Sequence, residues 1–157
     1  MGAASVSGPV HLSVPVEVDA PAQRVWDAVV DWEAQGRWIL GTRVRATRGA
    51  GREVGDRVTA VTAIGRFGFA DEFEITGWDP PRECVVRHLG RVVRGTGTFA
   101  VQAQTAARSR FVWSEDLVLP LGGLGRAGWP LVRPAMAAGV RRSLRRFADL
   151  VAAGRIG

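Results

Sequence analysis

The sequence contains no lysine, no tyrosine and no asparagine, and its 157 residues include one cysteine and two histidines. Without lysine, the chain can form neither a Schiff base nor a P-loop that ends in Gly-Lys-Ser/Thr. Without tyrosine, it has no phenolic acid. A single cysteine, Cys84, excludes an intramolecular disulfide and a multi-thiolate metal site, and His11 and His88 lie too far apart for a His-Glu-x-x-His helix. We predict no metal and no cofactor, so catalysis would have to use Asp, Glu, Arg, Ser, Thr, His88 or bound water.

The basic charge is concentrated at the C-terminal end of the chain. All 21 basic side chains are arginine, and with 15 acidic residues they give a net charge of +6. Residues 1–125 carry 14 basic and 14 acidic side chains, whereas residues 126–157 carry 7 arginines and one acid, Asp149. A nucleic-acid-binding domain usually shows a broader basic stripe with interleaved aromatic residues. We therefore expect no DNA partner.

Long apolar runs are also missing. No stretch of roughly 18 apolar residues occurs, and the start of the chain has neither a charged nor an apolar leader segment. We predict no membrane span, no secretory signal and a cytoplasmic location. Hydrophobic residues make up 46% of the chain, and no linker or repeat divides it. We expect one domain over residues 10–157, preceded by a flexible start over residues 1–9.

The first forty residues predict one strand and two short helices. Val10–Val18 alternates apolar and polar side chains, which is typical of a strand with one buried face, and Pro15 indicates the edge of a sheet. The acidic residue and proline in Asp19–Pro21 mark a helix start, and apolar residues recur at helical spacing up to about Asp31. A second helix is expected over residues 33–39.

The segment 41–120 predicts an antiparallel sheet. Short runs of alternating apolar and polar residues are separated by turns rich in glycine and proline. Strands that follow one another through short loops pair antiparallel. The expected strands cover residues 42–48, 56–65, 69–78, 83–89, 96–104 and 109–119. Together with the first strand they form a sheet of about seven strands.

A long amphipathic helix is predicted at the end of the chain, beginning near Pro130 or Pro134 and ending near Ala153. At 100° per residue, its large apolar side chains fall on one arc and its arginines fall on the opposite arc. The apolar arc consists of Val132, Met136, Val140, Leu144, Phe147, Leu150 and Val151. The arginine face consists of Arg141, Arg142, Arg145 and Arg146.

Three segments carry a resemblance to a known superfamily. They read V-E-V-D-A-P-A-Q-R-V-W-D-A-V-V-D-W over residues 16–32, W-D-P-P over 78–81, and W-S-E-D-L-V-L-P over 113–120. In their order and spacing, over about residues 10–153, they resemble the SRPBCC superfamily of START-like lipid carriers, birch-pollen-allergen-like proteins and polyketide cyclase/dehydrase-like proteins.

The resemblance implies an α+β helix-grip fold. In this fold a curved antiparallel sheet wraps around the long C-terminal helix, two short helices follow the first strand, and a deep apolar cavity lies between sheet and helix. Members of the superfamily include carriers and enzymes, so the resemblance does not set the function.

The glycine-rich segment before the last helix matches a dinucleotide-binding pattern by chance. Residues 123–128 read G-x-G-x-x-G, and Asp149 follows about 20 residues later. However, no second parallel strand follows, so the βαβ unit that this motif requires cannot form. We expect these glycines to form a loose turn that lets the last helix fold back over the sheet, with the turn itself as a mobile lid over the cavity.

Two carboxylates interrupt otherwise apolar strand faces. Glu115 shares a face with Phe111 and Trp113, and Asp71 shares one with Phe69 and Phe73. If both point inward, they form a candidate acid/base pair or an anchor for a polar ligand group. The alternative is that they pair with an arginine such as Arg66, or lie in water at the mouth of the cavity.

His88 is the third catalytic candidate, because imidazole transfers protons near neutral pH. Apolar residues stand on both sides of the short strand around His88, so the alternation does not decide which face points inward. The alternative role is that of a surface or hydrogen-bonded structural histidine.

Several large apolar residues are candidates to line the cavity and contact a ligand. The alternative for each is an ordinary place in the core. A cavity of about 300–1,000 Å³ would suit an aromatic, isoprenoid or acyl ligand. The candidates are Trp38, Phe69, Phe73, Phe99, Trp113, Met136 and Val140.

Three functional hypotheses follow, for a protein expected to be a monomer or a homodimer. The first is binding of a small hydrophobic molecule, such as a lipid, an isoprenoid or a polyketide-like compound. The second is a polyketide aromatase/cyclase or dehydratase, with Asp71 or Glu115 as the base and an inward arginine that stabilises an enolate. The third is an interaction protein whose arginine face, Arg141, Arg142, Arg145 and Arg146, contacts anionic lipid or RNA.

Overall fold

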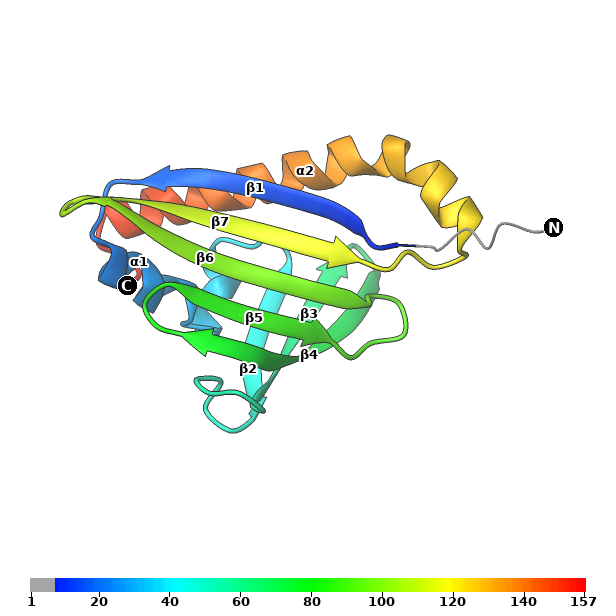
Figure 1. The fold of residues 1–157 in the computed structure, drawn as a ribbon, viewed down its shortest axis with the longest axis horizontal. Coiled ribbons are helices and arrows are strands. Elements are labelled where there is room, and N and C mark those ends of the chain that lie inside the picture. The colour runs from blue at the N-terminus through cyan, green and yellow to red at the C-terminus, as the bar shows by residue number, and fades with distance from the viewer. Residues whose placement is uncertain (1–7) are drawn as a thin grey trace.

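The computed structural model describes residues 8–157 and shows a curved sheet crossed by one long helix (Figure 1). Of the predicted flexible start, residues 1–7 lie outside the described range. The helical elements are α1 (Ala22–Val29), the short 3-10 helix η1 (Glu33–Arg37) and α2 (Gly123–Ala152). The strands are β1 (Val10–Val18), β2 (Thr42–Arg48), β3 (Arg57–Ile64), β4 (Phe67–Asp79), β5 (Glu83–His88), β6 (Gly95–Thr105) and β7 (Arg108–Leu117).

The seven strands form one antiparallel sheet in the order β1-β7-β6-β5-β4-β3-β2. The strands β2 to β7 follow one another as a meander, and β1 pairs with β7 at one edge, where the backbone nitrogen of Pro15 has no hydrogen to donate. The sheet is strongly twisted: β2 and β3 run at a steep angle to β1 and β7 (Figure 1). This is the α+β helix-grip arrangement that the sequence predicts.

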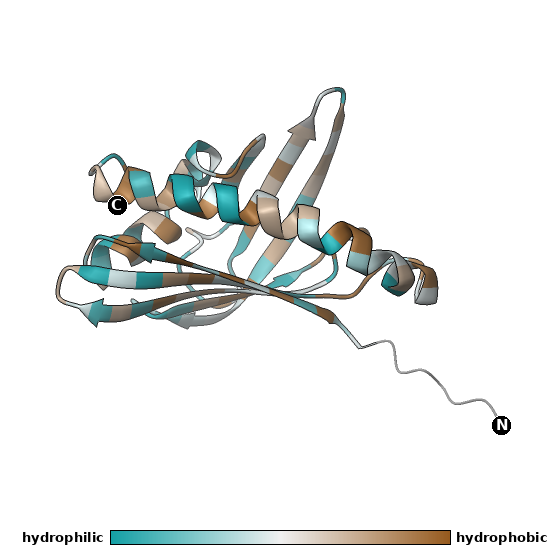
Figure 2. Ribbon diagram, turned by 90° about the horizontal axis from the view of Figure 1, so that it is seen from above, coloured by the Kyte–Doolittle hydropathy of each residue, from teal (hydrophilic) through white to brown (hydrophobic). Residues whose placement is uncertain are grey.

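α2 lies across the sheet (Figures 1 and 2). Aromatic side chains pack it against the sheet. The ring of Phe147 lies 5.0 Å from the ring of Trp38 and 5.0 Å from that of Phe111, measured between centroids. All three side chains are fully buried. The C-terminal half of α2 is therefore part of the hydrophobic core.

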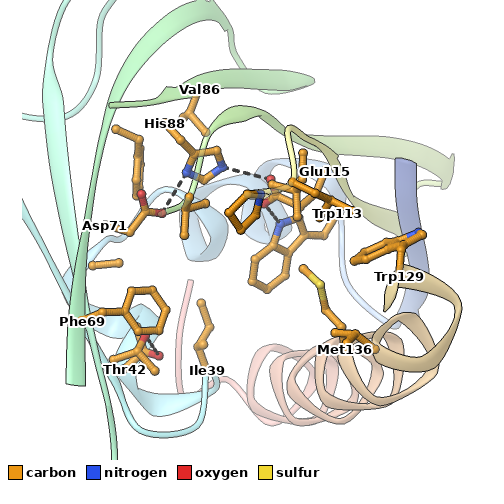
Figure 3. Close-up of a pocket in the computed structure, with 18 of the residues that line it drawn as sticks. Ile39, Thr42, Phe69, Asp71, Val86, His88, Trp113, Glu115, Trp129 and Met136 are labelled. Carbon is orange, nitrogen blue, oxygen red and sulfur yellow. Dashed lines mark hydrogen bonds and ion pairs between the residues drawn. The ribbon is translucent and has the colours of Figure 1, made fainter. Parts of the chain in front are cut away.

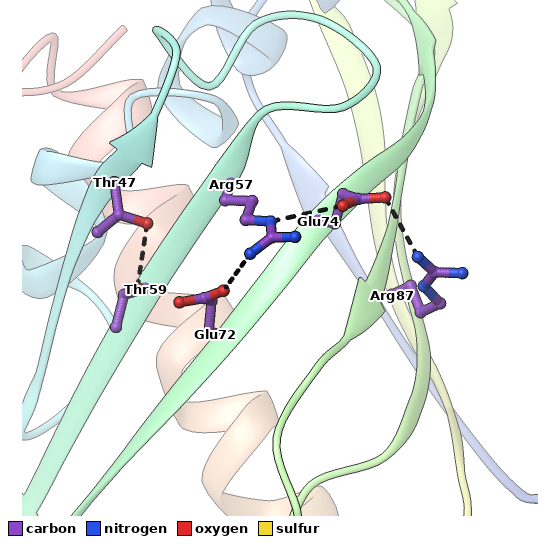
Figure 4. A network of polar contacts seen from close by, with 6 residues as sticks. All are labelled: Thr47, Arg57, Thr59, Glu72, Glu74 and Arg87. Carbon is purple, nitrogen blue, oxygen red and sulfur yellow. Dashed lines mark hydrogen bonds and ion pairs between the residues drawn. The ribbon is translucent and has the colours of Figure 1, made fainter.

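The outer face of the sheet carries a polar network instead (Figure 4). Arg57 on β3 contacts Glu72 at 3.1 Å and Glu74 at 3.5 Å, both on β4. Arg87 on β5 contacts Glu74 at 3.2 Å. These cross-strand ion pairs are partly exposed and contribute little individually. They confirm the alternation of apolar inner and polar outer residues on which the strand predictions depend.

The helix predictions differ from the structure at two places. The second short helix is a 3-10 turn that ends at Arg37 instead of extending to residue 39. α2 begins at Gly123 and contains both Pro130 and Pro134, so the glycines predicted to form a loose turn belong to the helix. Glycine and proline both disfavour a helix interior. Trp129 in these first turns packs against the hydrophobic core. The first turns of α2 bend away from the rest of the helix (Figure 1).

None of the helices in the described range is both long and apolar enough to cross a membrane. The cytoplasmic location, the single domain over residues 10–157 and the monomeric or dimeric state stay predictions from the sequence. Cys84 is fully buried, and burial raises the pKa of its thiol to about 12. It therefore packs as a small hydrophobic residue.

Candidate functional site

A cavity of about 600 Å³ lies between the inner face of the sheet and the N-terminal part of α2 (Figure 3). Its wall is almost entirely apolar, with side chains from all strands except β1, from the loop before α2 and from α2 itself. Among the residues that line it, only Asp71, Glu115 and His88 are ionisable, and no arginine is present. The inward arginine of the enzyme hypothesis is therefore not found in the cavity wall.

The three ionisable residues form one hydrogen-bonded cluster in the cavity wall (Figure 3). His88 Nδ1 lies 2.8 Å from Asp71 Oδ2, and His88 Nε2 lies 3.0 Å from Glu115 Oε2. Trp113 Nε1 donates a hydrogen bond of 2.7 Å to the other oxygen, Glu115 Oε1. His88, Asp71 and Glu115 form no ion pair with Arg66 or any other arginine in residues 8–157.

The sheet register explains how residues from three strands meet. His88 on β5 stands opposite Phe73 on β4, so Asp71 occupies the diagonal position on the same face. Glu115 is two strands away from β5, with β6 between them. The intervening β6 residue is Gly97, which pairs with Glu115, and a Cβ atom there would lie 3.0 Å from Glu115 Oε1. Gly97 therefore leaves the space through which Glu115 reaches His88.

The cluster keeps His88 protonated at neutral pH. Burial lowers the pKa of the imidazole, but the hydrogen bonds and negative charges of Asp71 and Glu115 outweigh burial and raise it to about 9. The side chain of His88 is 7% exposed. An imidazolium between two carboxylates leaves one net negative charge. Moving the shared proton onto either carboxylate does not change this total, so the cavity wall is negative in every arrangement of that proton.

A second polar group lies on the other side of the cavity from His88 and Glu115, around Thr42 (Figure 3). The hydroxyl oxygens of Thr42 and Thr62 lie 3.0 Å apart. Gln35, which is buried, uses its amide nitrogen to donate to the carbonyl of Val29 at 3.0 Å. These neutral groups could hydrogen-bond the far end of a ligand that also contacts the charged cluster.

The structure brings Asp71, His88 and Glu115 together, although the sequence left the direction of His88 open. Five of the seven predicted ligand-contacting residues line the cavity, namely Phe69, Phe73, Phe99, Trp113 and Met136. Trp38 and Val140 are not among the residues that line it. Trp38 is buried in the core, with its ring centroid 6.0 Å from that of Trp113. Val140 is partly buried and packs against the core.

Sequence reasoning missed several lining residues. Leu124 and Trp129 precede the predicted helix start near Pro130 or Pro134, so the sequence predicts no helical face on which to place them. Gln35, Thr42 and Thr62 were not distinguished from ordinary polar residues. Gly97 had a detectable signal, since Gly95 and Gly97 occupy alternate positions of a strand whose next inward residue is Phe99. Two missing side chains on one strand face indicate space for a neighbouring residue.

Comparisons with known proteins identify the family and the fold. The family described as "Polyketide cyclase / dehydrase and lipid transport" matches residues 9–152. A search of curated proteins returns no match. Among solved structures, TTHA0849 from Thermus thermophilus aligns with a TM-score of 0.76 and 18% identity, over 92% of this chain and 99% of its own.

Two further structural neighbours are described as aromatase/cyclases. Zhui from a Streptomyces species aligns with a TM-score of 0.65 and 20% identity, over 93% of each chain. The di-domain ARO/CYC protein BexL from the BE-7585A biosynthetic pathway aligns with a TM-score of 0.68 and 17% identity, over 89% of this chain and 45% of its own. At these identities the likenesses show the fold alone, and they confirm the predicted helix-grip arrangement.

Proposed function

The chain belongs to the polyketide cyclase/dehydrase and lipid transport family, and we propose that it binds an uncharged hydrophobic small molecule of lipid, isoprenoid or polyketide type. The observation that carries this proposal is the cavity itself. Its volume of about 600 Å³ falls in the range of small-molecule sites, and its wall is apolar apart from a few convergent polar groups. Such a wall binds a ligand mainly by removing its apolar surface from water.

The charge of the cluster restricts the kind of ligand. An anionic head group within about 4–6 Å of the net negative charge would be repelled by roughly 3–4 kcal/mol at an effective dielectric constant of about 20. No arginine in the cavity wall offsets this repulsion. A hydroxyl or carbonyl group avoids it and can hydrogen-bond to the cluster or to Thr42. We therefore infer that neutral ligands bind more tightly than carboxylates of the same chain length.

A matched pair of ligands tests the proposal. The neutral dye Nile red is bound to the purified protein and displaced by a straight-chain alcohol or by the fatty acid of equal length. We expect the alcohol to bind at least about tenfold more tightly at neutral pH, as the charge repulsion implies. If neither the dye nor the two ligands bind, the proposed function is wrong. If acid and alcohol bind equally, the ligand is not selected by charge.

Two neighbouring residues on β4 provide a matched control. Asp71→Asn removes one charge from the inner face, whereas Glu72→Gln removes one charge from the outer face, where Glu72 pairs with Arg57. We expect Asp71→Asn to reduce the preference for the alcohol and Glu72→Gln to leave it unchanged. An equal effect of both substitutions would show that the net charge of the protein, not the cavity wall, sets the preference.

A second candidate function, catalysis of an intramolecular aldol cyclisation, is favoured by the short hydrogen bonds of His88. In this proposal Glu115 or Asp71 takes a proton from a carbon between two ketones. The electron pair left on that carbon forms a bond to a second carbonyl carbon, and the resulting alkoxide takes a proton from the His88 imidazolium. The carboxylic acid then returns its proton to His88 across the 2.8 or 3.0 Å hydrogen bond, and loss of water from the alcohol yields a double bond.

The cyclisation is tested with a poly-β-ketone substrate by comparing product distributions. We expect the wild-type protein to enrich one cyclised product, and Glu115→Gln and His88→Gln to return the distribution towards that of the uncatalysed reaction. Glu72→Gln serves as the control with an unchanged cavity. If Glu115→Gln, Asp71→Asn and His88→Gln all leave the distribution of the wild type unchanged, the chain is a binding protein without this activity.

A further inference from the structure

The mouth of the cavity lies between β4 and the first turns of α2. Phe69, Leu124 and Val132 line the cavity, and yet their side chains are 47%, 77% and 56% exposed. Residues that belong to the wall and also face solvent mark the place where the cavity opens. This opening is at the end of the molecule where the β5–β6 loop and the loop before α2 also lie (Figure 1).

Large apolar side chains surround this opening on four separate segments. Each stands within two residues along the chain of one that lines the cavity, so all lie close to the cavity wall. Phe67, Leu121 and Leu131 are 80%, 80% and 84% exposed, which is nearly complete exposure for apolar residues of this size. The set, here called the mouth rim, consists of Leu40, Phe67, Val92, Leu121 and Leu131. A soluble surface rarely gathers so many exposed apolar side chains without a binding role.

The mouth rim is interspersed with arginines that have no acidic partner. Three of these four segments contribute Arg66, Arg91, Arg94, Arg126 and Arg133, all exposed. None of them forms an ion pair in the part of the chain that the structure describes. Acidic residues near this end are already engaged, since Asp71 contacts His88 and Asp116 contacts His11 at 2.8 Å. The rim therefore combines apolar side chains with an uncompensated positive charge.

We propose that the mouth rim docks onto an anionic lipid bilayer. Its apolar side chains stand on separate tips around an opening instead of forming one continuous face. A bilayer accepts such separate protrusions without a matching shape, and its negative headgroups attract the surrounding arginines. A hydrophobic ligand could then pass between the bilayer and the cavity without crossing water. This last step rests on the proposed binding function, whereas the docking itself does not.

The arginine face of α2 lacks the same combination. Arg141, Arg142 and Arg145 are exposed, but no large apolar side chain is exposed beside them in the C-terminal half of the helix. Arg146 donates a hydrogen bond to the carbonyl of Arg37 and so ties α2 to η1. Positive charge without apolar contacts gives weaker attachment to a bilayer. We therefore place the proposed lipid contact at the mouth rim and not at the arginine face that the third hypothesis names.

Co-sedimentation with vesicles tests the docking. Vesicles of phosphatidylcholine alone are compared with vesicles of phosphatidylcholine and phosphatidylglycerol, at low and at high salt. We expect binding to the anionic vesicles, weakened by salt. Leu121→Ser/Leu131→Ser and Arg126→Gln/Arg133→Gln are each expected to weaken it roughly tenfold or more. Neither pair lines the cavity, so Nile red binding in solution should stay unchanged in both variants.

Two control variants match the test variants in chemistry but not in position. Val54→Ser removes an apolar side chain that is 62% exposed in the β2–β3 loop, and Arg141→Gln/Arg142→Gln removes two arginines from the arginine face. Both should bind anionic vesicles like the wild type. The proposal is overturned if the wild type binds neither vesicle, or if the controls lose as much binding as the rim variants. Binding to an acidic protein but to no vesicle would also overturn it, in favour of a protein partner.

Discussion

The two halves of α2 both contain large apolar residues and arginines, but their apolar side chains are buried in one half and partly exposed in the other. In the C-terminal half, Leu144, Phe147 and Val151 are buried against the core, and the arginines point outward as a regular amphipathic pattern requires. In the N-terminal half, Leu124 and Leu131 are largely exposed, and Trp129 and Met136 line the cavity. Figure 2 shows the difference as alternating polar and apolar bands in the C-terminal half of α2 and mainly apolar or pale bands nearer its start.

This difference separates stability from binding along a single helix. One end fills the core and stabilises the fold, while the other leaves space between itself and the sheet and exposes apolar side chains around that space. An apolar side chain that is not buried in the folded protein contributes little to its stability. Such residues near a cavity are more simply explained by a ligand or a surface that covers them.

The largest expected effect comes from breaking the core end of α2. Phe147→Ala removes a fully buried ring that packs on Trp38 and Phe111, and should lower the free energy of unfolding by about 3–5 kcal/mol. Leu131→Ala removes a side chain that is 84% exposed, and should change the free energy of unfolding by about 0.5 kcal/mol or less. Urea denaturation of the two variants measures both values. Similar losses would contradict the division of α2 into a core end and an open end.

The next effect is a pH dependence that originates in the cavity. Folding raises the pKa of His88 from 6.5 to about 9, so the folded state holds this proton more tightly than the unfolded state. The resulting stabilisation is fully present below about pH 6.5 and is lost as the pH rises through about 9, to a total of roughly 3 kcal/mol. Unfolding measured over this range should show that loss in the wild type and not in His88→Gln. An identical pH slope in both proteins would contradict the prediction.

A smaller effect distinguishes two glycines. A Cβ atom at Gly97 would lie 3.0 Å from Glu115 Oε1 and 3.1 Å from a methyl group of Val86, so Gly97→Ala should cost about 1–3 kcal/mol. Gly139 lies inside α2 with nothing within 4 Å of such an atom. Gly139→Ala should therefore stabilise the protein by about 0.5–1 kcal/mol. Thermal unfolding of the two variants should show shifts of opposite sign, and a gain in Gly97→Ala would contradict the assigned role of Gly97.

Most of the fold could be predicted from the sequence because its strands are half buried. Strands with one solvent-exposed face, such as β1 and β2, show a clear alternation of buried and exposed side chains, and their predicted limits agree with the structure. The start of α2 could not be predicted, since Gly123, Pro130 and Pro134 all count against a helix locally. Trp129 and Met136 pack against core residues that are distant in the sequence, and local helix propensity does not reflect such contacts.

The candidate site was predictable residue by residue but not as an arrangement. A carboxylate on an apolar strand face is visible in the sequence, and this pattern predicts Asp71 and Glu115 as site residues. The direction of His88 was not visible, because Cys84, Val85 and Val86 are all apolar and obscure the alternation. The connection from His88 to Glu115 spans three strands and depends on the missing side chain of Gly97, so it emerges only from the sheet register.

The two histidines provide the most direct test of the central claim, that the cavity beside the cluster binds an uncharged hydrophobic ligand. His88 lies in the cavity wall, whereas His11 lies on the exposed edge strand β1 and contacts Asp116. The ring signals of both residues can be followed by NMR while a straight-chain alcohol is added. The account predicts that the signals of His88 shift and saturate while those of His11 stay in place. Unchanged His88 signals, or equal shifts of both histidines, would contradict it.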